Sequence, residues 1–350
     1  MVTSFERFQA RIVRSLMASP EPIVRWLGGS PVRNAYGAEL DAHAQLLARA
    51  QRAAGRPPYE RGSVARARRE LELGFSVVQA APPNGVTRTE RYVDGGVSAR
   101  RAFVYVPSDV RGPLPALVYF HGGGFVVGTL DAYDAGCRTI AAEAESIVIS
   151  VDYRLAPEHP FPAAVDDGLA AFRWVVAHAE ELGIDPAHVA VGGDSAGGNL
   201  AAVTCLRARD EGGPCPCFQW LIYPATDMTR ALPSHREHAA GPFLEKGTID
   251  WFMSHYLAPS DDPRHPHASP LFAASHASLP PAYIVVAGFD PLRDEGLAYA
   301  DVLRAAGVPV TLVHATTLVH GFFSMAGALP AGHAARAQAI CELARGLRAS

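Results

Sequence analysis

The sequence predicts an α/β fold, a largely parallel sheet covered by helices on both faces. Short, near-continuous apolar segments alternate with helical stretches through most of the chain, a pattern typical of buried parallel strands. The chain has 350 residues, of which 49% are hydrophobic and 19% charged, enough for one large domain with additions. No Pro/Gly/Ser-rich linker, low-complexity block or internal repeat divides it.

The N-terminal part is expected to be helical. Apolar residues recur at spacings of three and four over residues 4–17 and 39–54. The second run stops at Gly55, with Pro57 and Pro58 just beyond. We therefore expect an N-terminal helical segment, residues 1–75, ahead of the main α/β domain, residues 76–350.

Strands are expected from about residue 87, where the hydrophobic period changes to two. Residues 87–93 and 99–106 alternate around Asp94-Gly95-Gly96, which predicts an antiparallel hairpin at one edge of the sheet. Further strands are predicted at 116–120, 147–151, 189–192, 219–223, 282–287 and 308–314, with helices such as 163–182 and 198–210 between them.

The stretch between Pro224 and about Pro263 interrupts this alternation. It is too long for an ordinary connection and contains an apolar helix around residues 249–257. Long insertions in α/β enzymes commonly carry function, so we expect residues 228–262 to help build a pocket.

Charge argues against nucleic-acid and membrane-spanning classes. The formal net charge is −4 and the basic residues are scattered, so we expect no nucleic-acid partner. Residues 11–17 are basic and apolar but lack an unbroken apolar run, which predicts an amphipathic helix and no stable membrane insertion. The densest basic cluster precedes two glutamates and is typical of a solvated helix face; it comprises Arg61, Arg66, Arg68 and Arg69.

Cysteine usage indicates a reducing compartment. The 5 cysteines lack the spacing of a disulfide framework, so we expect free thiols and a cytoplasmic location. Cys215 and Cys217 are too close for the usual metal-binding or redox CxxC spacing, and no metal site is expected.

The strongest chemical signal is Gly193-Asp194-Ser195-Ala196-Gly197. It follows a predicted strand and opens a predicted helix, the context of a nucleophile on a strained strand-to-helix turn. Such a turn presents Ser195 at the carboxyl ends of the strands, where α/β sheets place their ligands. We therefore expect Ser195 to be a nucleophile.

A serine nucleophile needs a base, and His320 is the best placed of the histidines. It lies just past the last predicted strand, before Gly321, at the same sheet edge as Ser195. His314 is the closest rival, but it ends the strand itself and has no glycine beside it.

Asp290 is the expected partner of His320. It follows the strand at 282–287, and Pro291 forces the chain to turn there, whereas Asp294 and Glu295 suit the start of the next helix. The chain order Ser195, Asp290, His320 is that of α/β-hydrolases.

A glycine-rich loop, His121-Gly122-Gly123-Gly124, follows the strand at 116–120. Consecutive glycines permit conformations that turn N–H groups toward a bound anion. In esterases such a loop forms part of the oxyanion hole, together with the N–H after the nucleophile, here Ala196. No GxGxxG pattern or P-loop lysine accompanies it, which argues against nucleotide binding.

Together these elements resemble the hormone-sensitive-lipase-like family of bacterial esterases, family IV of the α/β-hydrolase superfamily. The resemblance extends over roughly residues 36–345. It rests on motifs in the family's order: the loop from His121 to Phe125, residues 151–164, residues 193–199, residues 290–295 and His320-Gly321-Phe322.

The resemblance implies an eight-stranded, mostly parallel α/β-hydrolase sheet with a helical cap built from the N-terminal helices and the insertion. It implies a carboxylesterase of short- to medium-chain esters that needs no cofactor and is, in many relatives, a homodimer. Gly122, Gly123 and Ala196 would be the oxyanion donors. The chain departs from the family at Ala315-Thr316-Thr317, ahead of the catalytic histidine, which puts the pocket's shape in question.

The expected reaction is two-step acyl transfer through an acyl-enzyme. An amidase or deacetylase would use the same triad, a lipid-interface lipase would suit the basic N-terminus, and a non-catalytic ligand-binding relative would keep only the fold.

Substrate preference depends on how the cap closes over Ser195. Aromatic candidates for the pocket wall are Trp26, Tyr36, Phe125, Phe243, Trp251, Phe252 and Phe322. The strand near residues 308–313 is a candidate edge for pairing with a second copy.

Overall fold

The computed structural model describes residues 15–55, 58–108 and 110–349. Eight strands form one sheet in the order β1-β2-β4-β3-β5-β6-β7-β8. Their bounds are β1 Val86–Val93, β2 Arg100–Pro107, β3 Leu114–Phe120, β4 Ile147–Val151, β5 Ile184–Asp194, β6 Gln219–Ile222, β7 Ala282–Phe289 and β8 Val310–Val319.

The sheet is mostly parallel, as predicted. Only β1 and β2 run antiparallel, β1 against β2 and β2 against β4, so the predicted hairpin occupies one edge and β8 the other. The central strands are buried on both faces; every residue of β4 and β7 is buried. Near-continuous apolar sequence therefore identified them, because a two-sided sheet leaves no face for polar residues.

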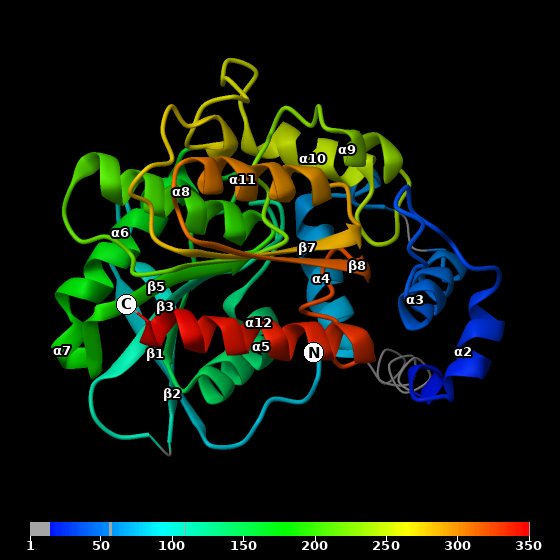
Figure 1. The fold of residues 1–350 in the computed structure, drawn as a ribbon, viewed down its shortest axis with the longest axis horizontal. Helices are drawn as coiled ribbons and strands as arrows, with labels where there is room; N and C mark the ends of the chain where they lie inside the picture. Colours follow the sequence, from blue (N-terminus) through cyan, green and yellow to red (C-terminus); the bar gives the residue numbers. More distant parts are fainter. Residues whose placement is uncertain (1–14, 56–57, 109, 350) are drawn as a thin grey trace.

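Helices cover the two faces of the sheet, with α6, α8 and α11 on one side and α5 and α12 on the other (Figure 1). The helices of the α/β domain are α5 Leu130–Ala144, α6 Ala163–Ala177, α7 Ala179–Leu182, α8 Ala196–Glu211, α11 Arg293–Ala305 and α12 Pro330–Arg348. Alternate residues of β3 point to opposite faces: Val118 and Phe120 belong to one apolar cluster, and Leu117 and Tyr119 to the other.

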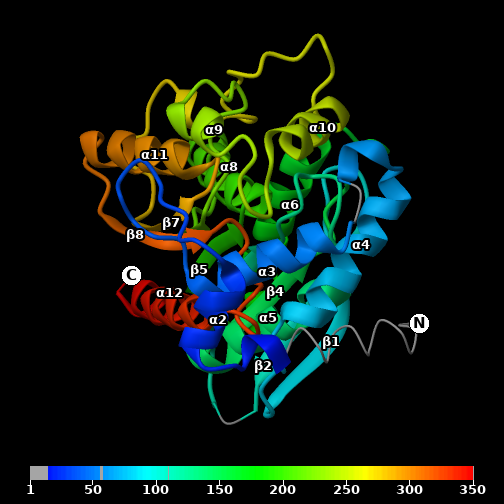
Figure 2. The ribbon, with the colours of Figure 1, turned by 90° about the vertical axis from the view of Figure 1, so that its right-hand side faces the viewer.

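The N-terminal segment lies at one end of the sheet (Figures 1 and 2). It contains α2 Glu21–Gly28, α3 Ala42–Ala53, η1 Tyr59–Arg61 and α4 Val64–Val78. Asp41 and Ser63 cap α3 and α4 by accepting the N–H groups of Ala44 and Arg66. The helix predicted over 4–17 falls mostly outside the described residues, and residues 15–17 are helical.

The insertion after β6 contains two short helices, α9 Pro233–Glu237 and α10 Lys246–Tyr256, and a 3-10 turn follows at η2 Pro270–Phe272. α10 corresponds to the helix expected around residues 249–257. Aromatic contacts join it to the N-terminal segment: the Tyr59 ring lies 6.1 Å from that of Phe252 and 6.3 Å from that of Trp251. Two segments remote in sequence thus meet over one end of the sheet.

Candidate active site

Ser195 lies on a sharp turn between β5 and α8. Its backbone has φ 57° and ψ −117°, a strained conformation for a residue with a side chain. The turn needs glycine on both sides: a Cβ at Gly193 would lie 2.2 Å, and one at Gly197 1.8 Å, from the carbonyl oxygen of Phe120. The spacing of the glycines around Ser195 therefore follows from close backbone packing against β3.

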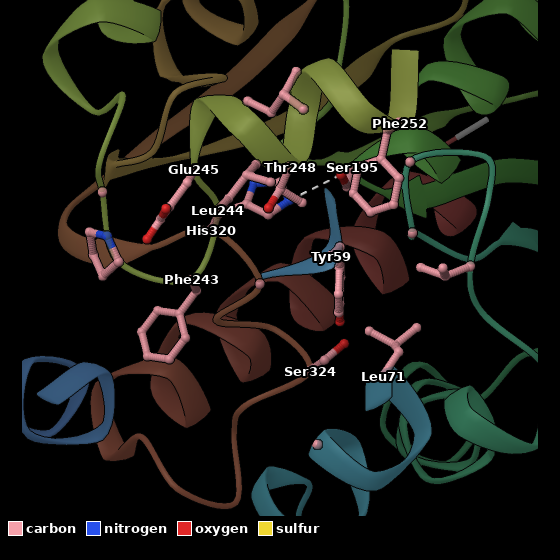
Figure 3. A pocket seen from close by; sticks show the side chains of 18 of the residues that line it. Tyr59, Leu71, Ser195, Phe243, Leu244, Glu245, Thr248, Phe252, His320 and Ser324 are labelled. Carbon is pink, nitrogen blue, oxygen red and sulfur yellow. Dashed lines mark hydrogen bonds between the residues drawn. The ribbon is translucent and has the colours of Figure 1, made fainter. Parts of the chain in front are cut away.

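Ser195, His320 and Asp290 form a continuous hydrogen-bonded chain. His320 Nε2 lies 3.0 Å from Ser195 Oγ (Figure 3). His320 Nδ1 lies 2.8 Å from Asp290 Oδ2. Asp290 is completely buried, and its other oxygen accepts the N–H of Leu292 at 2.8 Å. β7 and β8 end next to Asp290 and His320, so the parallel sheet brings residues far apart in sequence to one edge. The arrangement suits a base that removes the Ser195 proton.

The glycine loop differs from expectation at its first glycine. The N–H of Gly122 donates to Asp194 Oδ1 at 2.9 Å, so it is not available to a bound oxyanion. Gly123 and Gly124 have φ of 122° and 59°, and both line the cavity beside Ser195 and Ala196. Within the described ranges, neither of their N–H groups has a protein acceptor. The geometry therefore favours Gly123, Gly124 and Ala196 as the anion-binding set, in place of Gly122, Gly123 and Ala196.

A cavity of about 570 Å³ extends from Ser195 between the N-terminal segment and the insertion after β6. Its lining is mainly apolar and comes from α3 and α4, the glycine loop, the insertion and the loop after His320. Figure 3 shows Leu244 and Thr248 from the insertion on one side of Ser195 and Leu71 from α4 on the other. Three of the predicted wall residues line it, namely Phe125, Phe243 and Phe252.

The other predicted wall residues lie elsewhere, beginning with Trp26 and Tyr36. Trp26 is 80% exposed on α2 because that helix packs on α3 through its opposite face. Tyr36 is 60% exposed and packs edge-on against His314, with the Arg293 guanidinium over its ring. Both lie outside the cavity lining, because the N-terminal segment turns these faces away from Ser195.

Trp251 and Phe322 also lie outside the lining. Trp251 neighbours Phe252 but stacks near His255, with ring centroids 4.5 Å apart, on another face of α10. Phe322 is fully buried and packs edge-on against Tyr223, whose ring also contacts that of His320. Sequence spacing placed them near the site but left their orientation undecided.

The sequence does not predict the roles of two buried acids at the site. Asp194 belongs to the serine motif, and in the structure its carboxylate is 4% exposed and accepts hydrogen bonds from Tyr119 and Gly122. Glu295 was expected simply to begin α11. Its carboxylate is buried in the cavity wall, 2.7 Å from His235 Nε2, and accepts the N–H of Thr226. An acid that immediately follows another in Asp294-Glu295 gives no sequence signal of burial.

Burial dominates the protonation of these acids. It raises the pKa of Glu295 to about 7, against the opposing effect of the hydrogen bond from His235. Burial likewise raises the pKa of Asp194, while the hydrogen bonds from Tyr119 and Gly122 and the nearby imidazoles of His121 and His320 act in the opposite direction.

The described residues hold neither a metal-binding cluster nor a disulfide. They contain no group of three or more His, Cys, Asp or Glu side chains arranged to hold a metal ion. None of the cysteines forms a disulfide: Cys137, Cys205, Cys215, Cys217 and Cys341. No helix within the described ranges is long and apolar enough to cross a bilayer.

Comparison with known proteins gives consistent results. A family described as alpha/beta hydrolase fold matches residues 117–324. Carboxylic ester hydrolase LipN of Mycobacterium tuberculosis is 51% identical over 260 residues, 72% of this chain and 69% of the relative. Esterase LipI of the same organism is 48% identical over 255 residues, 72% of this chain and 79% of the relative.

Solved structures agree with these sequence matches. An alpha/beta hydrolase enzyme from the metagenome of Lake Arreo superposes with a TM-score of 0.85 at 43% identity, covering 87% of this chain and 98% of that one. A thermostable esterase from Pseudomonas putida superposes with a TM-score of 0.84 at 36% identity, covering 88% of this chain and 98% of that one.

Proposed function

Because this chain belongs to the hormone-sensitive-lipase-like branch of the α/β-hydrolase family, we propose that it is a carboxylesterase with Ser195 as its nucleophile. The observation that carries the proposal is the unbroken chain of hydrogen bonds from Asp290 through His320 to Ser195, at one side of an apolar cavity. The relatives named as esterases support the ester class.

The first step is formation of an acyl-enzyme. Ser195 Oγ attacks the ester carbonyl carbon as His320 Nε2 accepts the hydroxyl proton. Asp290, already bound to Nδ1, fixes the ring orientation and stabilises the imidazolium. The carbonyl oxygen, now negative, accepts hydrogen bonds from Gly123, Gly124 and Ala196. His320 then protonates the leaving alcohol.

Water completes the cycle. His320 removes a proton from a water molecule as the water oxygen attacks the acyl carbon. His320 then returns the proton to Ser195 Oγ as the acid is released. The site needs no group beyond these side chains and backbone N–H groups.

The size and lining of the cavity favour short- to medium-chain esters as substrates. α3 and α4 from the N-terminal segment and α10 from the insertion lie over Ser195 and act as a cap. The cavity of about 570 Å³ is apolar over most of its lining, which suits a hydrocarbon acyl chain of limited length. Cysteines without disulfides suit a reducing, cytoplasmic location. β8 is the last strand of the sheet, and its outer edge offers a surface for a homodimer.

The test is hydrolysis of p-nitrophenyl esters from acetate to palmitate by purified protein, with Ser195→Ala in parallel. Wild-type activity should peak at short or medium chains, and the variant should lose on the order of 10⁶-fold in kcat. Wild-type turnover by Ser195→Ala would refute the assigned nucleophile. Faster cleavage of matched amides than of esters would instead indicate an amidase.

A further inference from the structure

Asp194, the residue before Ser195, is a buried carboxylate that contacts the glycine loop. Its Oδ1 accepts the hydroxyl of Tyr119 at 2.6 Å and the N–H of Gly122 at 2.9 Å. Its Oδ2 accepts the hydroxyl of Tyr133 at 3.5 Å. Contact with the loop is tight, since a Cβ at Gly122 would lie 2.5 Å from Oδ2.

These contacts join two separate parts of the anion-binding site. Gly122 leads directly into Gly123 and Gly124, and Asp194 leads through Ser195 into Ala196. No other hydrogen bond in the described part of the chain links the backbone of residues 122–124 to that of residues 194–196. The Asp194 carboxylate thus fixes the distance between the loop amides and the Ala196 amide, on which oxyanion stabilisation depends.

The groups around Asp194 act on its pKa in opposite directions: burial has the largest effect and raises it, and the hydrogen bonds from Tyr119 and Gly122 oppose burial. Tyr119, Tyr133 and Gly122 all donate to the carboxylate. Burial, followed by the charge of Asp194, raises the pKa of Tyr119 and Tyr133 well above the usual tyrosine value, so both remain protonated donors.

Five other titratable groups interact with Asp194. Tyr153 and Tyr223 are buried and have pKa values raised by burial and then by Asp194, so they too stay neutral. Burial also raises the pKa of the Cys137 thiol, which therefore stays protonated. His121 is fully buried, and burial lowers its pKa, which keeps its ring neutral. His320 acts on Asp194 by lowering the pKa of its carboxyl.

We propose that Asp194 is a positioning residue that holds the glycine loop in register with Ser195. The inference rests on the proposed function, because it assigns Asp194 a role in that same reaction. Asp290 orients the His320 ring through direct contact, whereas Asp194 acts through the glycine loop.

Two substitutions test the hydrogen bond to Gly122. Asp194→Asn keeps an oxygen that accepts from Gly122, so kcat should stay within about threefold of wild type. Asp194→Ala removes the acceptor, so kcat should fall about 10-fold to 10²-fold with little change in KM or in the shape of the kcat/KM profile against pH, less than the 10²- to 10³-fold typical of losing an oxyanion donor.

Two further variants serve as controls. Asp301→Asn makes the same chemical change at a side chain that is 76% exposed on α11, and should leave the profile unchanged. Tyr119→Phe removes one hydrogen bond to Asp194 and keeps the ring, so it should lower kcat several-fold even if Asp194→Ala does not fold.

The readout is the pH dependence of Ser195 labelling by a fluorophosphonate, followed by intact mass, beside ester kinetics. Failure of the wild type to label would refute the proposed function itself. Normal wild-type labelling, with unchanged rates in Tyr119→Phe and in folded Asp194→Ala, would overturn the inference about Asp194 alone.

Discussion

The floor and the roof of the cavity are built by different physical means. The floor comprises the Ser195 turn, the glycine loop and the segments that carry Asp290 and His320; the roof comprises α3, η1, α4 and α10. Floor groups are held by hydrogen bonds to the buried carboxylates of Asp194 and Asp290 and by glycines at positive φ. Roof groups are held mainly by side-chain packing, such as that of Tyr59 on Phe252. Substitutions in the floor should therefore change kcat, and those in the roof should change substrate preference.

Polar contacts of Arg68 join the roof to segments next to the floor. Arg68 on α4 donates to the carbonyl of Val126 at 2.9 Å and makes two hydrogen bonds to Glu158, of 2.8 and 2.7 Å. The sequence predicts a solvated helix face here, and the Arg68 side chain is 28% exposed. Periodicity does not show that this side chain also reaches a neighbouring loop. Arg68 thus couples a cap helix to the segment just after the glycine loop.

The largest expected effect concerns the contact between floor and roof at the glycine loop. Gly123→Ala and Gly124→Ala should each lower kcat on the order of 10²-fold, because both glycines have positive φ and no room for a Cβ. The added Cβ at Gly123 would meet the carbonyl oxygen of Val127 at 2.0 Å, whereas that at Gly124 would meet the ring of Phe252 at 2.2 Å.

A second substitution distinguishes the two glycines. Adding Phe252→Ala should restore part of the kcat of Gly124→Ala and none of that of Gly123→Ala. The Cβ added at Gly124 overlaps the Phe252 side chain, which this substitution removes, whereas the Cβ added at Gly123 overlaps the backbone of Val127. Steady-state kinetics on one short ester would show this difference. Equal recovery in both double variants would contradict the distinction between floor and roof.

An intermediate effect is expected within the roof. Phe252→Leu should raise KM several-fold with kcat changed less than about twofold, because the ring contributes binding surface rather than reacting groups. The loss in unfolding free energy should be below about 1.5 kcal/mol. Kinetics across an acyl-chain series and chemical denaturation would measure both quantities.

Trp26→Leu is the matched control for this change. Trp26 is 80% exposed and outside the cavity lining, so kinetics should be unchanged and stability should stay within about 0.5 kcal/mol. A change in chain-length preference from Trp26→Leu would place α2 in the substrate path, contrary to the structure.

The smallest effect concerns the Glu295 carboxyl in the cavity wall. Its pKa is about 7 in the folded chain, above the ordinary value of 4.5, so the folded state retains a proton that the unfolded state releases. Stability should therefore fall as pH rises from about 4.5 to about 7. Glu295→Gln cannot titrate, so its melting temperature should vary less with pH, by a few degrees over that window.

Calorimetry at several pH values would measure this difference. Glu295→Gln and wild type should differ most in the slope of melting temperature against pH, and Asp301→Asn should behave as wild type. An identical slope in the two proteins would show that Glu295 does not take up a proton in this range.

Local sequence patterns were sufficient to predict three features: the sheet, its antiparallel edge, and the proximity of Ser195, Asp290 and His320. Buried parallel strands must be apolar throughout, and the residue after a strand falls at a known edge, so local patterns are sufficient. The closely packed turn at Ser195 likewise requires glycine at fixed positions, which makes the motif visible in one dimension.

Two features could be seen only in the folded structure: which glycine N–H groups are available to bind an oxyanion, and which aromatic residues line the cavity. Gly122 and Gly123 are chemically identical in sequence, and they differ because Asp194 lies 2.9 Å from one of them. Trp26 and Phe252 are both aromatic residues on short helices, and one is exposed while the other covers Gly124. These outcomes depend on contacts between residues that are far apart in sequence, which sequence periodicity does not relate.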